Sequence, residues 1–589
     1  MKYKIYFFFF FYIFFLFLSL FLWDYIYLEV YPLENFLRFY LFIIFSLLPL
    51  YFYLFKYKFV DYELHQIVFL NFFKQKTDLT INFIYIFFLF LIILNFLSFQ
   101  PKDFFSLDLY HDGFKLTPSM NFSLSNKFWS GSFIESGFFS NFQPLLALFF
   151  IDKISIGSTY FIKYAFIFLN KAILLTISFL AAKELKFSKN YKIIFFVLFS
   201  IFLLNLINKP GISYFPERYL LYLLFILLIF LNFLPNNYFS LVLSSLAIGS
   251  VSFISIFWWM DIFIFINSLL FIYCIFLFYR KEKNKLKYIF IGYFLFLILS
   301  FINFPKNEVI DFLKNTFYIV SKANKYNSFS YPSPLFGGDG RATKTLVFFS
   351  YSGLLLMLIV LKKKILISNL LKLFLIFLFL ASLISFLFGL GCPDSYHIVN
   401  STGLLMFNLI FYHLFLIFNF LHNKIIFKKN FFLLSLILLL TLFFFKEINL
   451  KKINNVLIVK ENITNLFLEN DDKFLNEKNL NYLNLIVYYD KLLDNGECVQ
   501  VFSDETIIPY LLKRKTCTKY FFYHTLVDEN IQVDFINELK KNMPRFILYK
   551  SDLFTFFEFF KRLKTVDDFI TKNYVFYDTF EYWTFYKLK

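Results

Sequence analysis

Long apolar runs, separated by short polar stretches, dominate the first 446 residues of the chain. An α-helix needs about 20 mainly apolar residues to cross roughly 30 Å of hydrocarbon. Runs close to that length predict thirteen membrane-spanning helices, so the chain is expected to be a polytopic α-helical membrane protein. The predicted spans are 5–23, 36–55, 79–99, 157–182, 193–208, 218–235, 239–257, 261–279, 288–304, 345–361, 367–390, 402–421 and 430–446.

Lysine and arginine gather in every second loop between these spans. Short cytoplasmic loops carry such an excess, so the alternation predicts an N-terminus in the cytoplasm and an outer position for everything after residue 446. In a bacterium this is the inner membrane with a periplasmic C-terminal domain. The basic loops contain Lys56, Lys58, Lys74 and Lys76, then Lys183, Lys186, Lys189 and Lys192, then Arg280, Lys281, Lys283, Lys285 and Lys287, then Lys362, Lys363 and Lys364, then Lys424, Lys428 and Lys429.

The composition excludes a soluble globular enzyme. Hydrophobic residues make up 59% of the chain and charged residues only 17%, whereas a typical soluble domain is about 25% charged. The formal net charge of +18 sits in the membrane loops, so it indicates topology and predicts no nucleic-acid partner. Four cysteines are too few for a disulfide-built scaffold.

Two loops on the predicted outer face are too long to be simple connectors. They are residues 100–156 and 305–344, and loops of that length usually have a function. The stretch 142–151, which starts Phe142-Gln143-Pro144, is apolar but too short to span a membrane. We expect it to lie at the membrane surface.

Residues 447–589 differ from the rest and predict a small α/β domain. Alternating short elements indicate a parallel sheet. Cys498 and Cys517 flank the first strand-helix unit and could pair in an oxidising compartment, with two free buried thiols as the alternative. The expected elements are strands at 498–503, 519–523 and 545–549 and helices at 507–514 and 532–542.

Candidate chemistry starts in the first long outer loop, at Asp108-Leu109-Tyr110-His111-Asp112-Gly113. Two carboxylates and an imidazole within five residues are more than a solvated loop needs. The alternative is a hydrated turn in which Asp-Gly only ends the preceding segment.

Other polar residues share the predicted outer face, and charges at a membrane interface are costly unless paired or used. Lys171 lies inside the fourth span, where it could neutralise a carboxylate, hold a lipid phosphate or extend to the surface. Glu217 and Arg218 could equally be a simple interfacial pair. The remaining candidates are Asp339 and Arg341 at the end of the second long loop, and Asp394 and His397 between the eleventh and twelfth spans.

The layout resembles the GT-C superfamily of integral-membrane glycosyltransferases, which includes protein mannosyltransferases and aminoarabinose transferases. The resemblance rests on the acidic outer loop Asp108–Gly113, the interfacial stretch after it and the C-terminal α/β segment Val501–Tyr549. Two features depart from the family: two spans precede the one leading into the acidic loop, and Asp108-x-x-x-Asp112 replaces Asp-x-Asp.

The resemblance implies a polyprenyl-phosphate-linked sugar donor, membrane lipids as surroundings, and a lipid, glycan or protein acceptor on the outer face. It implies an inverting displacement with Asp112 as general base. His111 or Asp108 would orient the acceptor or a divalent metal, and metal dependence stays open. Arg218, Lys171 or Arg341 would stabilise the phosphate leaving group, with Glu217 and Asp339 beside them, and Asp394 and His397 would line the acceptor side.

One related function and two other function classes stay open from the sequence. An O-antigen-type polymerase or ligase has neighbouring chemistry. A transporter or flippase of lipid-linked glycans would usually show repeated halves and a site at the membrane midplane, and neither is evident here. A non-catalytic glycan-binding protein would carry the same outer residues without turnover.

Overall fold

The structure, a computed structural model of the whole chain, describes residues 79–97, 107–134, 141–149, 153–207, 216–234, 238–326, 341–361, 366–391, 401–423, 471–474, 480–503, 505–526, 528–550 and 563–589. Three predicted spans, 5–23, 36–55 and 430–446, lie outside the described residues, as does the predicted domain boundary at 446/447.

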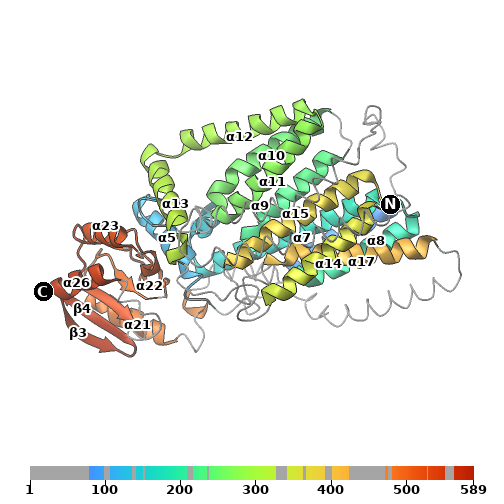
Figure 1. The fold of residues 1–589 in the computed structure, drawn as a ribbon. Coiled ribbons are helices and arrows are strands. Elements are labelled where there is room, and N and C mark those ends of the chain that lie inside the picture. Colours follow the sequence, from blue (N-terminus) through green and yellow to red (C-terminus); the bar gives the residue numbers. More distant parts are fainter. Residues whose placement is uncertain are drawn as a thin grey trace.

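Ten helices of the described part run side by side in one bundle, and each coincides with a predicted span (Figure 1). They are α4 (Leu79–Leu97), α7 (Ile156–Glu184), α8 (Lys189–Ile207), α9 (Pro216–Phe233), α10 (Tyr238–Trp258), α11 (Met260–Tyr279), α12 (Lys283–Asn303), α14 (Arg341–Leu361), α15 (Asn369–Gly391) and α17 (Gly403–Asn423). Among the described residues, four segments are long and apolar enough to cross a membrane: Ile156–Glu184, Tyr238–Trp258, Met260–Tyr279 and Asn369–Phe386.

Large apolar side chains point away from the bundle. Phe83, Phe271 and Ile302 have exposed fractions of 69%, 67% and 73%. Exposed apolar surface on this scale is unfavourable in water and marks contact with lipid or a partner. Together with the four long apolar helices, it identifies a multi-pass membrane protein.

Helices α10 and α12 cross at two glycines. A Cβ atom added to Gly249 would lie 2.0 Å from the Ile289 carbonyl oxygen, and one added to Gly292 would lie 2.2 Å from the Leu246 carbonyl oxygen. Small residues at such a crossing let two helix backbones approach closely, which is a main source of helix association in lipid. The pair therefore sets the distance between these helices.

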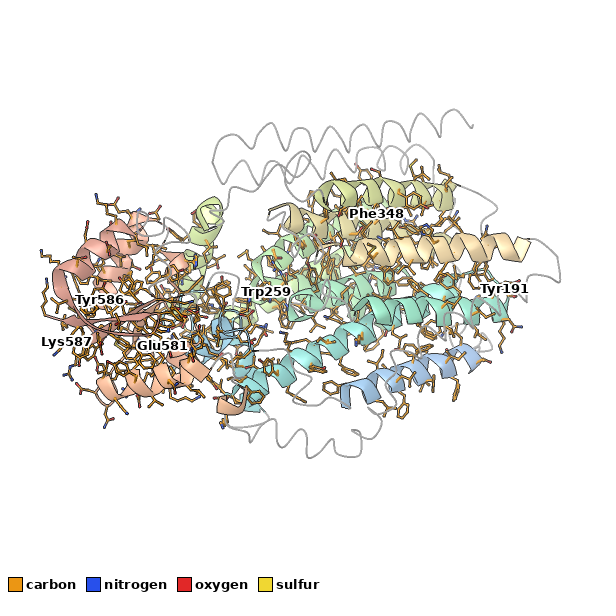
Figure 2. All side chains as sticks on the ribbon, turned by 90° about the horizontal axis from the view of Figure 1, so that it is seen from below. Tyr191, Trp259, Phe348, Glu581, Tyr586 and Lys587 are labelled. Carbon is orange, nitrogen blue, oxygen red and sulfur yellow. A yellow bond between two sulfur atoms is a disulfide. The ribbon has the colours of Figure 1, made fainter. Side chains whose placement is uncertain are left out.

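The two ends of the bundle differ. Trp259 lies at the end next to the C-terminal domain, and Tyr191 lies at the opposite end (Figure 2). At the Tyr191 end, the Lys186 backbone N–H donates to the Leu366 carbonyl at 2.9 Å, and Leu185 forms an isolated bridge with Ile367. Two loops that the lysine pattern places on one side thus meet there.

The C-terminal domain contains a four-stranded sheet with the order β1-β2-β4-β3. Only β1 and β2 are parallel, while β4 is antiparallel to both β2 and β3, so the prediction of a parallel sheet is correct only for the first pair. Its elements are α21 (Leu480–Leu492), β1 (Gln500–Phe502), α22 (Ile508–Leu511), η5 (Tyr523–Thr525), α23 (Glu529–Leu539), β2 (Phe546–Lys550), α26 (Lys564–Asn573), β3 (Tyr574–Phe580) and β4 (Trp583–Leu588).

The strand predicted at 519–523 is absent from this described segment. The chain beside β1 forms only one isolated bridge, between Val499 and Thr516. Three residues later the Lys519 carbonyl accepts the Phe133 N–H at 2.8 Å. The backbone here bonds to the outer loop instead of the sheet, and a short 3₁₀ turn, η5, follows it.

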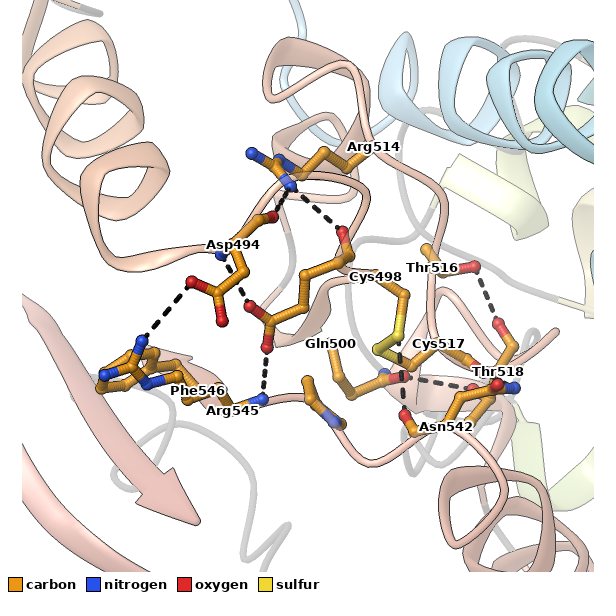
Figure 3. Close-up of a disulfide and its surroundings, with 12 residues drawn as sticks. Asp494, Cys498, Gln500, Arg514, Thr516, Cys517, Thr518, Asn542, Arg545 and Phe546 are labelled. Carbon is orange, nitrogen blue, oxygen red and sulfur yellow. Dashed lines mark hydrogen bonds and ion pairs between the residues drawn. A yellow bond between two sulfur atoms is a disulfide. The ribbon is translucent and has the colours of Figure 1, made fainter.

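Cys498 and Cys517 form a disulfide with Cα atoms 4.9 Å apart (Figure 3). Around it the Arg514 guanidinium donates to the Asp494 carbonyl at 2.5 Å, and the Asn542 amide donates to the Cys517 carbonyl at 3.5 Å. The disulfide closes the loop that carries α22 and Thr516.

Helices α5 (Gly113–Ser125) and α13 (Lys306–Tyr326) lie between the bundle and the C-terminal domain (Figure 1). The short helix η2 (Gln143–Phe149) occupies the predicted interfacial stretch. The second long loop is predicted to be more than a simple connector, and its first half is the amphipathic α13, whose Val309 and Phe312 are buried. Residues of the two long loops therefore form a layer between bundle and domain.

Candidate functional site

Asp108 and His111 form a hydrogen-bonded pair in the turn before α5. Asp108 Oδ2 lies 2.6 Å from His111 Nδ1, and Asp108 Oδ1 accepts the backbone N–H groups of Tyr110 and His111 at 3.1 and 3.0 Å. The side chains keep exposed fractions of 40% for Asp108 and 37% for His111. The pair is therefore both rigidly placed and open to solvent.

The pKa of the Asp108 carboxyl is lowered to about 2. Burial acts to raise it, but the hydrogen bond and positive charge of His111, together with two backbone N–H groups, outweigh that effect. At neutral pH Asp108 is a carboxylate, so it cannot supply the hydrogen of the 2.6 Å contact. His111 Nδ1 carries that hydrogen, and Nε2 is the ring nitrogen that can accept a proton.

Asp112, the predicted base, is in a different setting. It is only 4% exposed and precedes the first residue of α5. Its Oδ2 accepts the Asp108 backbone N–H at 3.0 Å and the Tyr160 hydroxyl at 3.4 Å. Tyr160 belongs to α7, so Asp112 joins the turn to the bundle.

The turn and α5 dock on the C-terminal domain through Thr506. The Thr117 hydroxyl donates to the Thr506 carbonyl at 2.6 Å, and the Thr506 hydroxyl donates to the Tyr110 carbonyl at 2.8 Å. A Cβ atom added to Gly113 would lie 2.3 Å from the Ile507 nitrogen, so this close approach needs glycine. Thr506 thereby fixes the carbonyl next to His111.

Aromatic rings pack beside the His111 side chain, where the turn before α5 contacts the C-terminal domain. The Tyr110 ring contacts His111 at 4.6 Å and Phe522 of the C-terminal domain at 5.4 Å between centroids. Phe114 lies 4.5 Å from Phe522, and His524 lies 4.6 Å from the same ring. His524 is half-buried, whereas Phe522 and Tyr523 beside it are buried. Polar groups next to aromatic rings are typical of small-ligand sites.

Helix α13 fixes the middle of the first long loop. The buried Glu308 carboxylate accepts the backbone N–H groups of Trp129 and Ser130 at 2.7 and 3.0 Å and also the Ser130 hydroxyl. Phe312 of the same helix packs against the Trp129 ring at 4.7 Å. The turn at 128–131 is thus fixed to α13.

Asp471 connects the domain to α7. Its carboxylate accepts the Ile156 N–H at 3.0 Å, the Tyr510 hydroxyl at 2.6 Å and the Lys513 ammonium at 2.8 Å. A carboxylate at the N-terminus of a helix satisfies otherwise unbonded N–H groups and favours the helix dipole. The start of α7, and with it Tyr160, is positioned by the C-terminal domain.

Two of the predicted phosphate-binding cations, Arg218 and Lys171, lie in different parts of the bundle. Arg218 donates through Nε and Nη2 to Asp261 Oδ2 at 2.9 and 2.5 Å, and its guanidinium lies 4.9 Å from the centre of the Trp259 ring. Since Trp259 lies at the C-terminal-domain end of the bundle (Figure 2), Arg218 shares the face of the Asp108–His111 pair. Lys171 is buried midway along α7.

The structure leaves the other predicted residues untested. Glu217 lies in α9 and Arg341 begins α14, with only their backbones described. Asp339, Asp394 and His397 lie outside the described residues. Within the described ranges, no group of three or more His, Cys, Asp or Glu side chains could hold a metal ion.

Several residues that build the site carry no local sequence signal. Glu308, Thr506, Thr516 and Asp471 act on partners far away in the chain: Thr506, for instance, is separated from Tyr110 by 396 positions. Asp261 is the exception, because a carboxylate after Trp258-Trp259 at the start of a span is unusual enough to single out.

No family model and no curated protein matches the chain. Similar solved structures include two crystal structures of ArnT from Cupriavidus metallidurans. The one bound to undecaprenyl phosphate has a TM-score of 0.46 and 10% identity, and the alignment covers 86% of this chain and 97% of that chain. The apo structure has a TM-score of 0.42, 11% identity and the same coverage. At this identity the likeness concerns the course of the chain and not its chemistry.

Proposed function

We propose that this chain is a membrane glycosyltransferase of the GT-C type, which moves a sugar from a polyprenyl-phosphate-linked donor to an acceptor hydroxyl on the outer face. The observation that carries the proposal is the Asp108–His111 pair, hydrogen-bonded at 2.6 Å and open to solvent. It lies where the outer loop, the C-terminal domain and the end of the bundle meet. A lipid-linked donor would reach such a place from the membrane and an acceptor from the aqueous side.

In this proposal His111 is the general base and Asp108 is its positioning residue. The Asp108 carboxylate holds the hydrogen on Nδ1, which leaves the lone pair on Nε2, as the carboxylate of a Ser-His-Asp triad does. The acceptor hydroxyl gives its proton to Nε2 while its oxygen bonds to the anomeric carbon. The bond from that carbon to the phosphate oxygen breaks, and polyprenyl phosphate leaves with the electron pair. Attack opposite the leaving group inverts the anomeric centre.

Asp112 then has a structural role instead of the predicted catalytic one. A base must reach its substrate, and the Asp112 carboxylate is 4% exposed with bonds to the Asp108 N–H and the Tyr160 hydroxyl. It holds the turn in the shape that presents His111.

Positive charge near the departing phosphate would lower the barrier. Arg218 is the best-supported candidate, because it lies at the correct end of the bundle and its pairing with Asp261 is only partly buried, with exposed fractions of 12% and 21%. Lys171 and Arg341 remain predicted phosphate ligands, with Glu217 and Asp339 near them. Asp394 and His397 remain predicted on the acceptor side. The inner membrane and a periplasmic C-terminal domain remain the proposed location.

The test is transfer by the full chain in proteoliposomes supplied with radiolabelled polyprenyl-phosphate sugars and an extract of cell-envelope acceptors. Loss of a general base costs typically 10²- to 10⁴-fold in rate. We therefore expect His111→Ala and Asp108→Asn to lose transfer to that extent, and Asp568→Asn, an exposed carboxylate on α26, to keep it. Full transfer by His111→Ala would refute the assigned base. Movement of intact lipid-linked sugar across the bilayer without transfer would favour a flippase.

A further inference from the structure

The basic turn, residues 280–287, comprises the connection between α11 and α12 and the first turn of α12, at the end of the bundle away from the C-terminal domain (Figure 1). It contains five cations and one carboxylate. Glu282 is used internally: it lies 2.7 Å from the Lys285 ammonium and 3.9 Å from Arg280. The Lys285 ammonium also donates to the Asn232 carbonyl at 3.0 Å. These two cations stabilise the turn itself.

Three other lysines of the turn point into the surroundings. Lys281, Lys283 and Lys287 are exposed, and the described residues offer none of them an ion-pair partner. Lys283 and Lys287 are four residues apart in α12, so they lie on one face of the helix, one above the other.

The same face of α12 continues as an apolar stripe. Phe290, Phe294 and Ile298 follow Lys287 at spacings of three and four residues, and their exposed fractions are 52%, 54% and 54%. This spacing keeps all five side chains on one side of the helix. A phospholipid whose acyl chain lies along the stripe would have its headgroup at the two lysines.

Aromatic side chains surround the basic turn at the same level. Phe278, Tyr279, Tyr238 and Phe239 are 72%, 55%, 65% and 72% exposed. The Tyr238 and Tyr288 hydroxyls lie 2.5 Å apart and join the start of α10 to the start of α12. Exposed tyrosines collect at the boundary between hydrocarbon and headgroups, so Tyr238 and Tyr279 put the lysines at headgroup depth.

We propose that Lys283 and Lys287, with Lys281 beside them, bind the phosphate of an anionic phospholipid whose acyl chain lies along Phe290, Phe294 and Ile298. Charge complementarity selects the headgroup, and the continuous exposed face of α12 selects a lipid as occupant. The positive-inside tendency explains why lysines occur in this loop. It does not account for their alignment above a lipid-facing stripe.

The experiment uses the full chain purified in a mild detergent and exposed to an equimolar mixture of phosphatidylglycerol and phosphatidylcholine. Native mass spectrometry counts the lipids that remain bound. We expect the wild-type chain to retain phosphatidylglycerol preferentially. Each lysine near an anionic headgroup contributes roughly fivefold in affinity, so the preference should fall at least about fivefold in the double variant Lys283→Gln, Lys287→Gln.

Two further variants separate this site from a general effect of charge. The pair Lys540→Gln, Lys541→Gln removes the same charge from exposed positions in the C-terminal domain and should leave the preference unchanged. Lys283→Arg, Lys287→Arg should keep it. Equal retention of both lipids by the wild-type chain, or an undiminished preference in the double glutamine variant, would overturn the proposal. None of these outcomes depends on whether the chain transfers sugars.

Discussion

Asn121 and Thr516 hold each other by two buried hydrogen bonds, although 395 positions separate them. The Asn121 amide donates to the Thr516 hydroxyl at 2.9 Å, and the Thr516 backbone N–H donates to the Asn121 amide oxygen at 3.0 Å. Thr516 adjoins Cys517 of the disulfide. The helix that follows the Asp108–His111 turn is thus fixed to the covalently closed part of the C-terminal domain.

Asn121→Ala should loosen this attachment. The substitution leaves the buried Thr516 N–H without its acceptor, and such an unsatisfied group costs about 1–3 kcal/mol. The Thr516 hydroxyl loses the Asn121 donor but still donates to the Thr518 carbonyl at 2.7 Å. We expect a lower temperature of thermal unfolding and faster protease cleavage near residue 126. Ser123→Ala is the control, because the exposed Ser123 hydroxyl bonds only within its own helix, to Met120. Equal stability of the two variants would contradict the role of Asn121.

The Asp108 carboxylate should stabilise the folded protein in a pH-dependent way. Its folded-state pKa of about 2 lies below the ordinary value of 3.8, so the folded form binds fewer protons than the unfolded form between these values. The stabilisation is complete above about pH 4 and is lost as the pH falls towards 2.

Thermal unfolding of the wild type and of Asp108→Asn at several pH values measures this effect. The wild type should be more stable near pH 6, and the difference in unfolding temperature should shrink to nothing near pH 2. A difference that stays constant across this range would mean that the His111–Asp108 contact contributes through packing and not through charge.

Gly249→Ala should destabilise the bundle. The new methyl group would lie 2.0 Å from the Ile289 carbonyl and 2.8 Å from the Tyr293 nitrogen, and both are backbone atoms that move only if α12 moves. Overpacking of this kind costs typically 1–3 kcal/mol. Leu243→Ala, on the exposed side of the same helix, is the control for thermal unfolding in detergent. Unchanged stability of Gly249→Ala would show that α10 and α12 can move apart at this crossing without a cost in free energy.

The spans could be predicted from the sequence because a helix in lipid must satisfy its backbone hydrogen bonds internally, so apolar length alone fixes it. Helix α13 and the hairpin of β3 and β4 lack that signal. Residues 575–579 of the edge strand β3 are all exposed, so no alternation of buried and exposed positions marks the strand. In α13 only one face is buried, so its sequence contains no long apolar run. The sequence pattern therefore includes it in the second long loop.

The sequence predicts which segment carries the candidate site, but not the role of each residue in it. The sequence marks Asp108, His111 and Asp112 as unusual, but which of them faces solvent depends on distant partners. Tyr160, in the next helix of the bundle, bonds to Asp112. Thr506 holds the Tyr110 carbonyl. Neither contact follows from local spacing, and so the burial that separates Asp112 from Asp108 appears only in the folded chain.

Substitutions of Arg218 and Asp261 can separate the proposed role of Arg218 at the donor phosphate from a purely structural role. Both Arg218→Gln and Asp261→Asn break the ion pair that joins α9 to α11. Hydrogen bonds between charged groups contribute about 1.5–3 kcal/mol, so both variants should unfold at a lower temperature.

Their effects on the donor should differ. Removing the guanidinium should raise the KM for the polyprenyl-phosphate sugar, whereas removing Asp261 leaves the guanidinium beside Trp259 with its full charge available to the phosphate, and the KM should stay equal or fall. Arg218→Lys should lie between wild type and Arg218→Gln, because a lysine keeps the charge but loses the two-nitrogen contact. If all three variants raise the KM equally while lowering stability, Arg218 acts by joining the helices and another cation meets the phosphate.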